Sequence, residues 1–247
     1  MLTYQETIWK ESAGYETKKI QLKIESIQSF ETIKEQSARI EKISLVVFLK
    51  KEQKKILNNV SKELNRNDSD FYQNHNLHVT VLGFGPLVKT SYEAILAKIQ
   101  EYSRKKQSTK LAITFDTIRP GTMYSGNTKL NPVSGIGNGT VVALGDVNNN
   151  KEFCNYSNEL TTFILKEKKL KSVLGANFRK RLPSVWCSLG YYHKPGTFRI
   201  GEELETIFRH YNDLRSERFR FDVSKICLVK SDHKNLADLT ILDKFNV

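Results

Sequence analysis

Hydrophobic and polar positions along this chain follow two periodicities, one typical of strands and one typical of helices. Short apolar runs rich in β-branched and aromatic residues predict strands at 43–49, 77–84, 111–118, 140–147, 184–192, 221–231 and 236–245. Apolar residues three or four positions apart predict amphipathic helices at 50–66, 91–106, 151–172 and 200–214.

The order of these elements repeats. A strand, helix, strand, helix, strand series over about 43–120 is followed by the same series over about 140–235. This order indicates a duplicated unit of roughly 100 residues. Between the two units, residues 119–139 are rich in Gly, Pro, Ser and Asn and predict a loop. We expect residues 1–42 to form an N-terminal extension, with a strand or helix near 18–36.

The stretch NLHVTVLGF, residues 76–84, sets a histidine and a threonine inside an apolar strand. Residues two apart share one face of a strand. One face is therefore expected to carry His78, Thr80 and Leu82. The opposite face is expected to be wholly apolar, with Leu77, Val79 and Val81.

The matching strand of the later unit carries a related pattern. When the two units are superposed, the segment HVTV of 78–81 falls on the segment WCSL of 186–189. The hydroxyl recurs, as Thr80 in one strand and Ser188 in the other. The imidazole does not recur, because Trp186 stands where a second histidine would be.

Composition narrows the class of partner. The chain has 247 residues, is 39% hydrophobic and carries a formal net charge of +12. This charge favours anionic partners such as nucleic acid, nucleotides or phosphate esters; the alternative is a lysine-rich surface that serves solubility. No apolar run reaches the roughly 18 residues of a membrane helix, and the first residues do not form a secretory signal. We therefore expect a cytoplasmic protein without a membrane partner.

The spacing of the cysteines indicates whether a zinc site or a disulfide framework is expected. Cys154, Cys187 and Cys227 are far apart and form no CxxC pair, which predicts neither a disulfide framework nor a zinc site. The glycine-rich loop contains neither GxxxxGK[ST] nor GxGxxG after a strand, so a nucleotide-triphosphate loop is not expected. We expect no metal and no cofactor.

At the HVT and WCS strands the chain resembles the 2H phosphoesterase superfamily, also called the LigT-like or 2′-5′ RNA ligase-like family. Members of that family have two lobes, each with an H-x-T/S motif on a strand, and the two motifs face one another across a cleft. The ending FDVSKICLVKSDHKNLADLTILDKF is similar to the family's last two strands. The resemblance covers about 43–247 and implies an α+β protein of two pseudo-symmetric lobes, each an antiparallel sheet flanked by helices, around a central cleft. The chain departs from the pattern at Trp186.

The resemblance implies hydrolysis or transfer at an RNA 2′,3′-cyclic phosphate end or a related nucleotide phosphodiester, with no metal required. Such a reaction needs one base and one acid, and imidazole suits both tasks. The catalytic residues that it implies here are His78, Thr80 and Ser188, whose hydroxyls can hydrogen-bond phosphate oxygens. Trp186 cannot shuttle a proton because its indole N–H only donates. It does offer a surface on which a base or ribose can stack.

Beside Trp186, four further residues are candidates for substrate binding: Tyr124, Arg179, Arg181 and His193. The arginines suit bidentate phosphate contacts, the tyrosine lies in a loop long enough to cover a cleft, and the histidine is a substitute acid at the end of its strand. Each also has a structural interpretation, as a solvated helix end, a connecting loop or a turn histidine. In the same way, His78 is also consistent with a half-buried histidine bonded to backbone, and Trp186 with a core residue.

Three functions stay open on the sequence alone. The first is an active or weakly active cyclic phosphodiesterase, a phosphoric diester hydrolase in which His78 is the surviving proton carrier. The second is a non-catalytic protein that binds RNA or a nucleotide on the same scaffold. The third is an interaction protein whose protein partner is unknown.

Overall fold

The computed structural model describes residues 42–67, 71–85, 87, 89–106, 110–120, 140–174, 184–192, 219–231 and 239–247. The expected extension before residue 42 and the expected helix at 200–214 lie outside the described residues, as does the loop from residue 121 onward. The same holds for four candidate binding residues: Tyr124, Arg179, Arg181 and His193.

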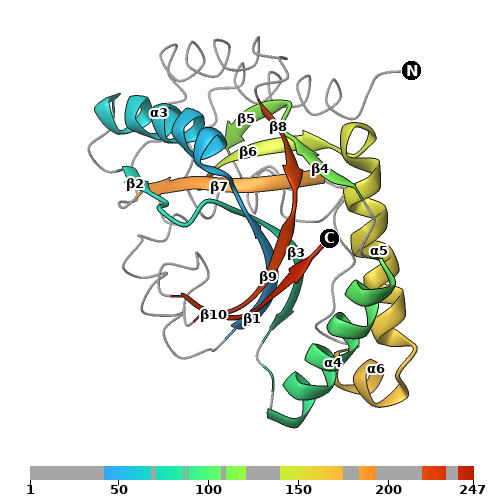
Figure 1. The fold of residues 1–247 in the computed structure, drawn as a ribbon. Coiled ribbons are helices and arrows are strands. Elements are labelled where there is room, and N and C mark those ends of the chain that lie inside the picture. The colour runs from blue at the N-terminus through green and yellow to red at the C-terminus, as the bar shows by residue number, and fades with distance from the viewer. Residues whose placement is uncertain are drawn as a thin grey trace, which may run out of the picture.

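The His78 strand lies at one edge of a four-stranded sheet of order β10-β9-β1-β3, in which every pair is antiparallel (Figure 1). The strands of this first sheet are β1 (Lys42–Phe48), β3 (His78–Gly85), β9 (Lys225–Ser231) and β10 (Leu239–Asn246). Strand β1 therefore lies between the His78 strand and the final strands of the chain.

The Trp186 strand lies inside a second four-stranded sheet of order β2-β7-β6-β5, which is also antiparallel. Its strands are β2 (Phe71–Gln73), β5 (Thr117–Pro120), β6 (Thr140–Asp146) and β7 (Ser184–Tyr192). A separate two-stranded ribbon pairs β4 (Leu111–Thr114) with β8 (Arg220–Val223).

Helices flank both sheets. They are α3 (Lys51–Asn67), α4 (Lys89–Lys105), α5 (Lys151–Leu165) and α6 (Lys168–Leu174), with a single 3₁₀ turn, η3 (Asn148–Asn150), before α5. Helix α3 packs against β2 and β7, whereas α4 and α5 lie side by side at the other end of the molecule (Figure 1). Antiparallel sheets flanked by helices confirm the expected α+β class.

The division into two lobes and the proposed domain bounds stay predictions. The sheets do not simply follow the two sequence units, because β9 of the later unit pairs with β1 of the earlier one. Likewise β2, between the first helix and the His78 strand, pairs with β7. Strand β2 was not expected from the polar segment in which it lies.

Some of the expected elements are divided in the structure. The helix expected at 151–172 is two helices, α5 and α6. The strand expected at 111–118 is β4 and β5, which belong to different sheets. The strand expected at 221–231 is likewise divided into β8 and β9, and the two lie in different sheets.

A polar network explains why β4 ends where it does. Asp116 follows β4, and its backbone N–H donates to the Leu144 carbonyl at 2.7 Å while its carboxylate accepts from the Asp146 N–H at 2.6 Å. The amide of the buried Asn150 holds the end of β4, accepting from the Thr114 N–H at 2.8 Å and donating to the Thr114 carbonyl at 2.9 Å. These bonds turn the chain from β4 toward β6.

One continuous apolar core joins the sheets to the helices. Fully buried side chains come from both sheets and from two helices: Leu45, Leu57, Val79, Phe153 and Leu189. Burial of such side chains stabilises the fold by roughly 1.5–3 kcal/mol for each side chain. Since the core includes the alternate residues of both motif strands, it fixes which residues of those strands face away from it.

Candidate functional site

The two motif strands show the same alternation of burial. In β3, His78 and Thr80 are half-buried, whereas Val79 between them is fully buried. In β7, Trp186 and Ser188 are half-buried, and Cys187 between them is fully buried. The motif residues therefore face away from the core in both strands, as strand periodicity predicts.

A β-bulge follows the hydroxyl residue of β3. Val46 of β1 pairs with Thr80, and the neighbouring Leu45 pairs with Leu82, so Val81 is an extra residue on β3. The extra residue shifts the alternation and turns Leu82 toward the core, where it is 3% exposed. The prediction that Leu82 shares the face of His78 was therefore wrong.

Strand β7 has a bulge at the matching position. Val142 of β6 pairs with Ser188, and the neighbouring Val141 pairs with Gly190, which leaves Leu189 as the extra residue. Each motif strand is thus irregular immediately after its hydroxyl residue. Bulges of this kind re-aim side chains and are frequent beside functional sites.

The bulged residue of each motif strand lies within hydrogen-bond distance of a buried serine on a helix. Ser157 of α5 donates to the carbonyl of Val81 in β3 at 2.9 Å. Ser61 of α3 lies 3.5 Å from the carbonyl of Leu189 in β7 and 3.1 Å from the carbonyl of Leu57 in its own helix. Helix α5 of the later unit therefore contacts β3 of the earlier unit. Helix α3 of the earlier unit contacts β7 of the later unit.

The two motif strands, β3 and β7, meet at His78 and Cys187. Strand β3 contacts β7, and the backbone N–H of His78 is hydrogen-bonded to the Cys187 thiol. Burial raises the pKa of this thiol to about 12, although the bond from His78 and the positive charge of Lys54 act in the opposite direction. The structure therefore brings the start of the HVT segment next to the middle of the WCS segment.

Asn74 connects the turn before His78 to strand β7 by hydrogen bonds. The sequence interpretation did not identify this residue. Its backbone N–H donates to the Leu189 carbonyl at 2.8 Å, and its side-chain Nδ2 donates to the Ser188 carbonyl at 3.2 Å. Its Oδ1 accepts from the Asn76 N–H at 3.1 Å, which forms an Asx turn just before His78. The asparagines in QNHN were the signal for the turn, but the bonds to β7 had no local signal.

The imidazole of His78 is held in one tautomer. Its Nδ1 lies 2.6 Å from the carbonyl oxygen of Asn76, and because a carbonyl only accepts, Nδ1 carries the proton and donates. In the neutral ring Nε2 is then an acceptor and can serve as a base. Burial lowers the pKa of His78, and the bond to Asn76 raises it by less, so the ring is neutral at pH 7.

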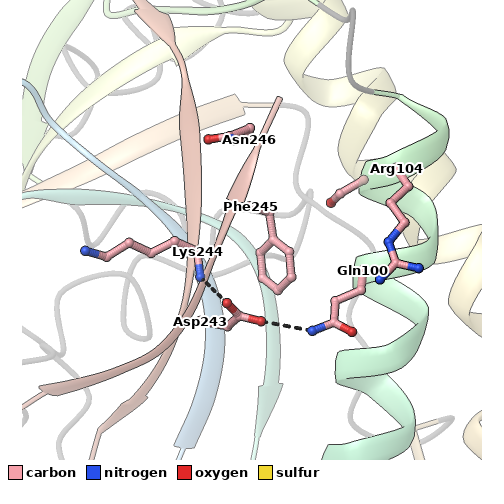
Figure 2. A pocket seen from close by; sticks show the side chains of 7 residues that line it. Gln100, Arg104, Asp243, Lys244, Phe245 and Asn246 are labelled. Carbon is pink, nitrogen blue, oxygen red and sulfur yellow. Dashed lines mark hydrogen bonds between the residues drawn. The ribbon is translucent and has the colours of Figure 1, made fainter.

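A pocket lies elsewhere in the described part of the chain. It has a volume of about 220 Å³ and lies between α4 and β10, and its walls are formed by Gln100, Ser103, Arg104, Asp243, Lys244, Phe245 and Asn246 (Figure 2). Gln100 donates to the Asp243 carboxylate there at 3.2 Å. Strand β10 is at the opposite edge of the sheet from β3, and none of the candidate site residues lines this pocket.

In the ranges that the structure describes, no three His, Cys, Asp or Glu side chains gather where they could hold a metal ion. None of the helices in those ranges combines the length and the apolar character that crossing a membrane requires. Cys154, Cys187 and Cys227 are buried, and none of them is joined in a disulfide.

The fold is that of the 2H phosphoesterases, as the H-x-T resemblance predicted. Among solved structures it is similar to TT0787 of Thermus thermophilus, with a TM-score of 0.54, 15% identity, and coverage of 83% of this chain and 97% of that one. It is also similar to a phosphoesterase (TM-score 0.51, 11% identity, 84% and 98% covered) and to E. coli LigT complexed with NADP+ (0.50, 10%, 84% and 98%). No family model and no curated protein matches the sequence. At these identities the likeness establishes the fold alone.

Proposed function

We propose that this protein is a cytoplasmic 2H phosphoesterase-like protein that acts on RNA 2′,3′-cyclic phosphate ends or a related nucleotide phosphodiester. The site would consist of His78 and Thr80 from β3 with Trp186 and Ser188 from β7. The proposal is supported most by one observation: two strands that lie in different sheets touch where the backbone of His78 is bonded to the Cys187 thiol.

The proposed roles follow from the chemistry of each side chain. His78 presents a neutral Nε2 that can remove a proton from the attacking water or hydroxyl. Thr80 and Ser188 would donate hydrogen bonds to the non-bridging phosphate oxygens and stabilise the charge that develops there. Trp186 would contact a base or ribose. The related fold of E. coli LigT, which was solved with NADP+, supports a nucleotide phosphate as the ligand.

The missing second imidazole limits the rate. Loss of one proton-transfer partner costs roughly 10²- to 10⁴-fold, so turnover would be slow. The presence of Trp186 also favours a second candidate function, in which the protein binds RNA or nucleotide ends without turning them over. Both candidates use the same site and differ only in whether His78 completes the reaction.

The test is incubation of the purified protein, without added metal, with a short RNA that ends in a 2′,3′-cyclic phosphate. Slow formation of a 2′- or 3′-monophosphate that is lost in His78→Ala supports the enzyme. Binding of the same RNA without product supports the second candidate. If the protein neither hydrolyses the RNA nor prefers it to the same RNA with a 3′-hydroxyl end, both candidates are excluded.

A further inference from the structure

A phosphate at the proposed site requires a positive partner. In a site with two imidazoles, one of them can carry a proton and supply that charge. Here Trp186 replaces one imidazole, and His78 is neutral at pH 7 because burial lowers its pKa. The hydroxyls of Thr80 and Ser188 supply hydrogen bonds but no charge. The positive charge must therefore come from outside the H-x-T pattern.

Lys54, in the first turn of α3, lies close to His78 through one aromatic ring. Its Nζ is 6.0 Å from the centroid of the Phe48 ring. The same ring packs edge-on against the His78 imidazole, with 6.4 Å between the ring centroids, and Phe48 is the β1 residue that pairs with His78. The Phe48 ring thus lies near both the ammonium of Lys54 and the imidazole of His78.

The face of α3 that carries Lys54 is turned toward the second sheet. Asn58, four residues further along, accepts a hydrogen bond from Gln73 of β2 at 2.9 Å. Ser61, seven residues further along, contacts the Leu189 carbonyl of β7. Residues at this spacing share one side of a helix. The charge of Lys54 also acts on the Cys187 thiol, which places it near both motif strands.

Among the residues that the structure describes, no carboxylate forms an ion pair with Lys54. The ion pairs among the described residues join Lys98, Lys105 and Lys106 to glutamates of α4, α5 and the segment after α5. Lys54 forms none of them, and its side chain is half-buried rather than fully solvated. A lysine carries its charge on a flexible four-carbon stem, so the ammonium is not fixed to one position.

We infer that Lys54 holds the substrate phosphate by charge, in place of the missing imidazole. The inference rests on the proposed function and extends it: the ligand is an RNA or nucleotide end with an anionic phosphate, gripped by Lys54 together with Thr80 and Ser188. The alternative is that Lys54 only covers the Phe48 ring, in a cation–π contact at the limit of the useful distance.

The experiment compares four proteins: wild type, Lys54→Gln, Lys54→Arg and Lys55→Gln. Lys55 is an exposed neighbour on the same helix, so Lys55→Gln makes the same change in net charge away from the site. The probes are a fluorescein-labelled trinucleotide RNA ending in a 2′,3′-cyclic phosphate and the same RNA ending in a 3′-hydroxyl. Binding is read by fluorescence anisotropy, and product is measured in the same samples.

We expect Lys54→Gln to weaken binding of the phosphate-ended RNA by about tenfold or more, with little change for the hydroxyl-ended RNA. Lys54→Arg should keep most of the preference, and Lys55→Gln should weaken both probes slightly and equally. A wild-type protein that neither prefers the phosphate end nor forms product overturns the proposed function itself, and one that forms product without that preference overturns only the role of Lys54. A wild-type preference that survives Lys54→Gln as well as it survives Lys55→Gln overturns only the role of Lys54. Circular dichroism of each variant establishes that it is folded.

Discussion

The hydroxyl of Ser157 donates a hydrogen bond of 2.9 Å to the carbonyl oxygen of Val81, the bulged residue that follows Thr80. Ser157 is fully buried on α5, and Val81 is 2% exposed on β3. This bond fixes the irregular backbone immediately behind the HVT motif. It has a weaker counterpart at the other motif, where the Ser61 hydroxyl lies 3.5 Å from the carbonyl of Leu189.

We predict that Ser157→Ala lowers the free energy of unfolding by about 0.5–1.5 kcal/mol, because a buried hydrogen bond of 2.9 Å to the Val81 carbonyl is lost. Ser61→Ala should cost less, since the Leu189 carbonyl keeps the 2.8 Å bond from the Asn74 N–H. Chemical denaturation measures both values. Ser172→Ala, at an exposed serine of α6, is the control and should change stability by less than about 0.5 kcal/mol. Equal effects at Ser157 and Ser172 would contradict the role given to the bond.

Asn74 offers a second test, because a single side chain connects the turn before His78 to the backbone of Ser188. Asn74→Ala removes the 3.2 Å bond to the Ser188 carbonyl and the Asx turn to Asn76. We expect a loss of about 1–3 kcal/mol in the free energy of unfolding and weaker binding of a phosphate-ended RNA. The exposed Asn148 provides the control, Asn148→Ala. The connection would be refuted if Asn74→Ala left both stability and binding at wild-type values.

The lowered pKa of His78 predicts a pH dependence of stability. In the unfolded chain the imidazole titrates near its ordinary value of 6.5, and in the folded protein it titrates at lower pH because of burial. Between these two values the unfolded state binds the proton more readily. Stability is therefore full above pH 6.5 and falls as the pH drops below it.

Denaturation curves at pH 7.5 and pH 5.5 measure this dependence. We expect His78→Gln to reduce the difference in unfolding free energy between the two pH values, while the same change at the exposed His75 leaves that difference closer to wild type. A His78→Gln variant that loses as much stability on acidification as the wild type does would show that the imidazole is not protonated on unfolding.

Substitution of Gly145, with Gly83 as the control position, tests how closely β4 packs against β6. A Cβ at Gly145 would collide with the carbonyl of Thr114 and lie 2.7 Å from Nδ2 of Asn150, whereas a Cβ at Gly83 would meet nothing within 4 Å. We predict that Gly145→Ala destabilises the protein by about 1–3 kcal/mol and that Gly83→Ala has a much smaller effect. Thermal unfolding compares the two. A larger loss for Gly83→Ala would mean that β4 is not held against β6 as described.

Local periodicity was enough to predict which residues of the motif strands face away from the core. His78 and Thr80 in β3, and Trp186 and Ser188 in β7, lie where a period of two places them. The face of Leu82 could not be predicted in this way. Its orientation depends on the extra residue Val81, and therefore on the register with β1, which is a non-local pairing.

The division of the expected strands was also decided by contacts that are remote in sequence. Residues 111–118 form a continuous strand pattern, but Asp116 is bonded to the backbone of β6, and this bond directs the chain into another sheet. Nothing in the sequence pattern distinguished Lys54 from the many other lysines of the chain. Only its position on α3, close to the Phe48 ring and to the Cys187 thiol, distinguishes it.

If positions 78 and 186 serve one phosphate site, Trp186→His should hydrolyse an RNA 2′,3′-cyclic phosphate faster than the wild type, and the rate of this hydrolysis is the decisive measurement. The new imidazole would supply the missing proton carrier, so we expect the rate to rise by roughly 10²- to 10⁴-fold, to be abolished by a second change, His78→Ala, and to show no rise in Trp186→Phe. A folded Trp186→His protein that hydrolyses the RNA no faster than the wild type would show that the two positions do not share a phosphate site.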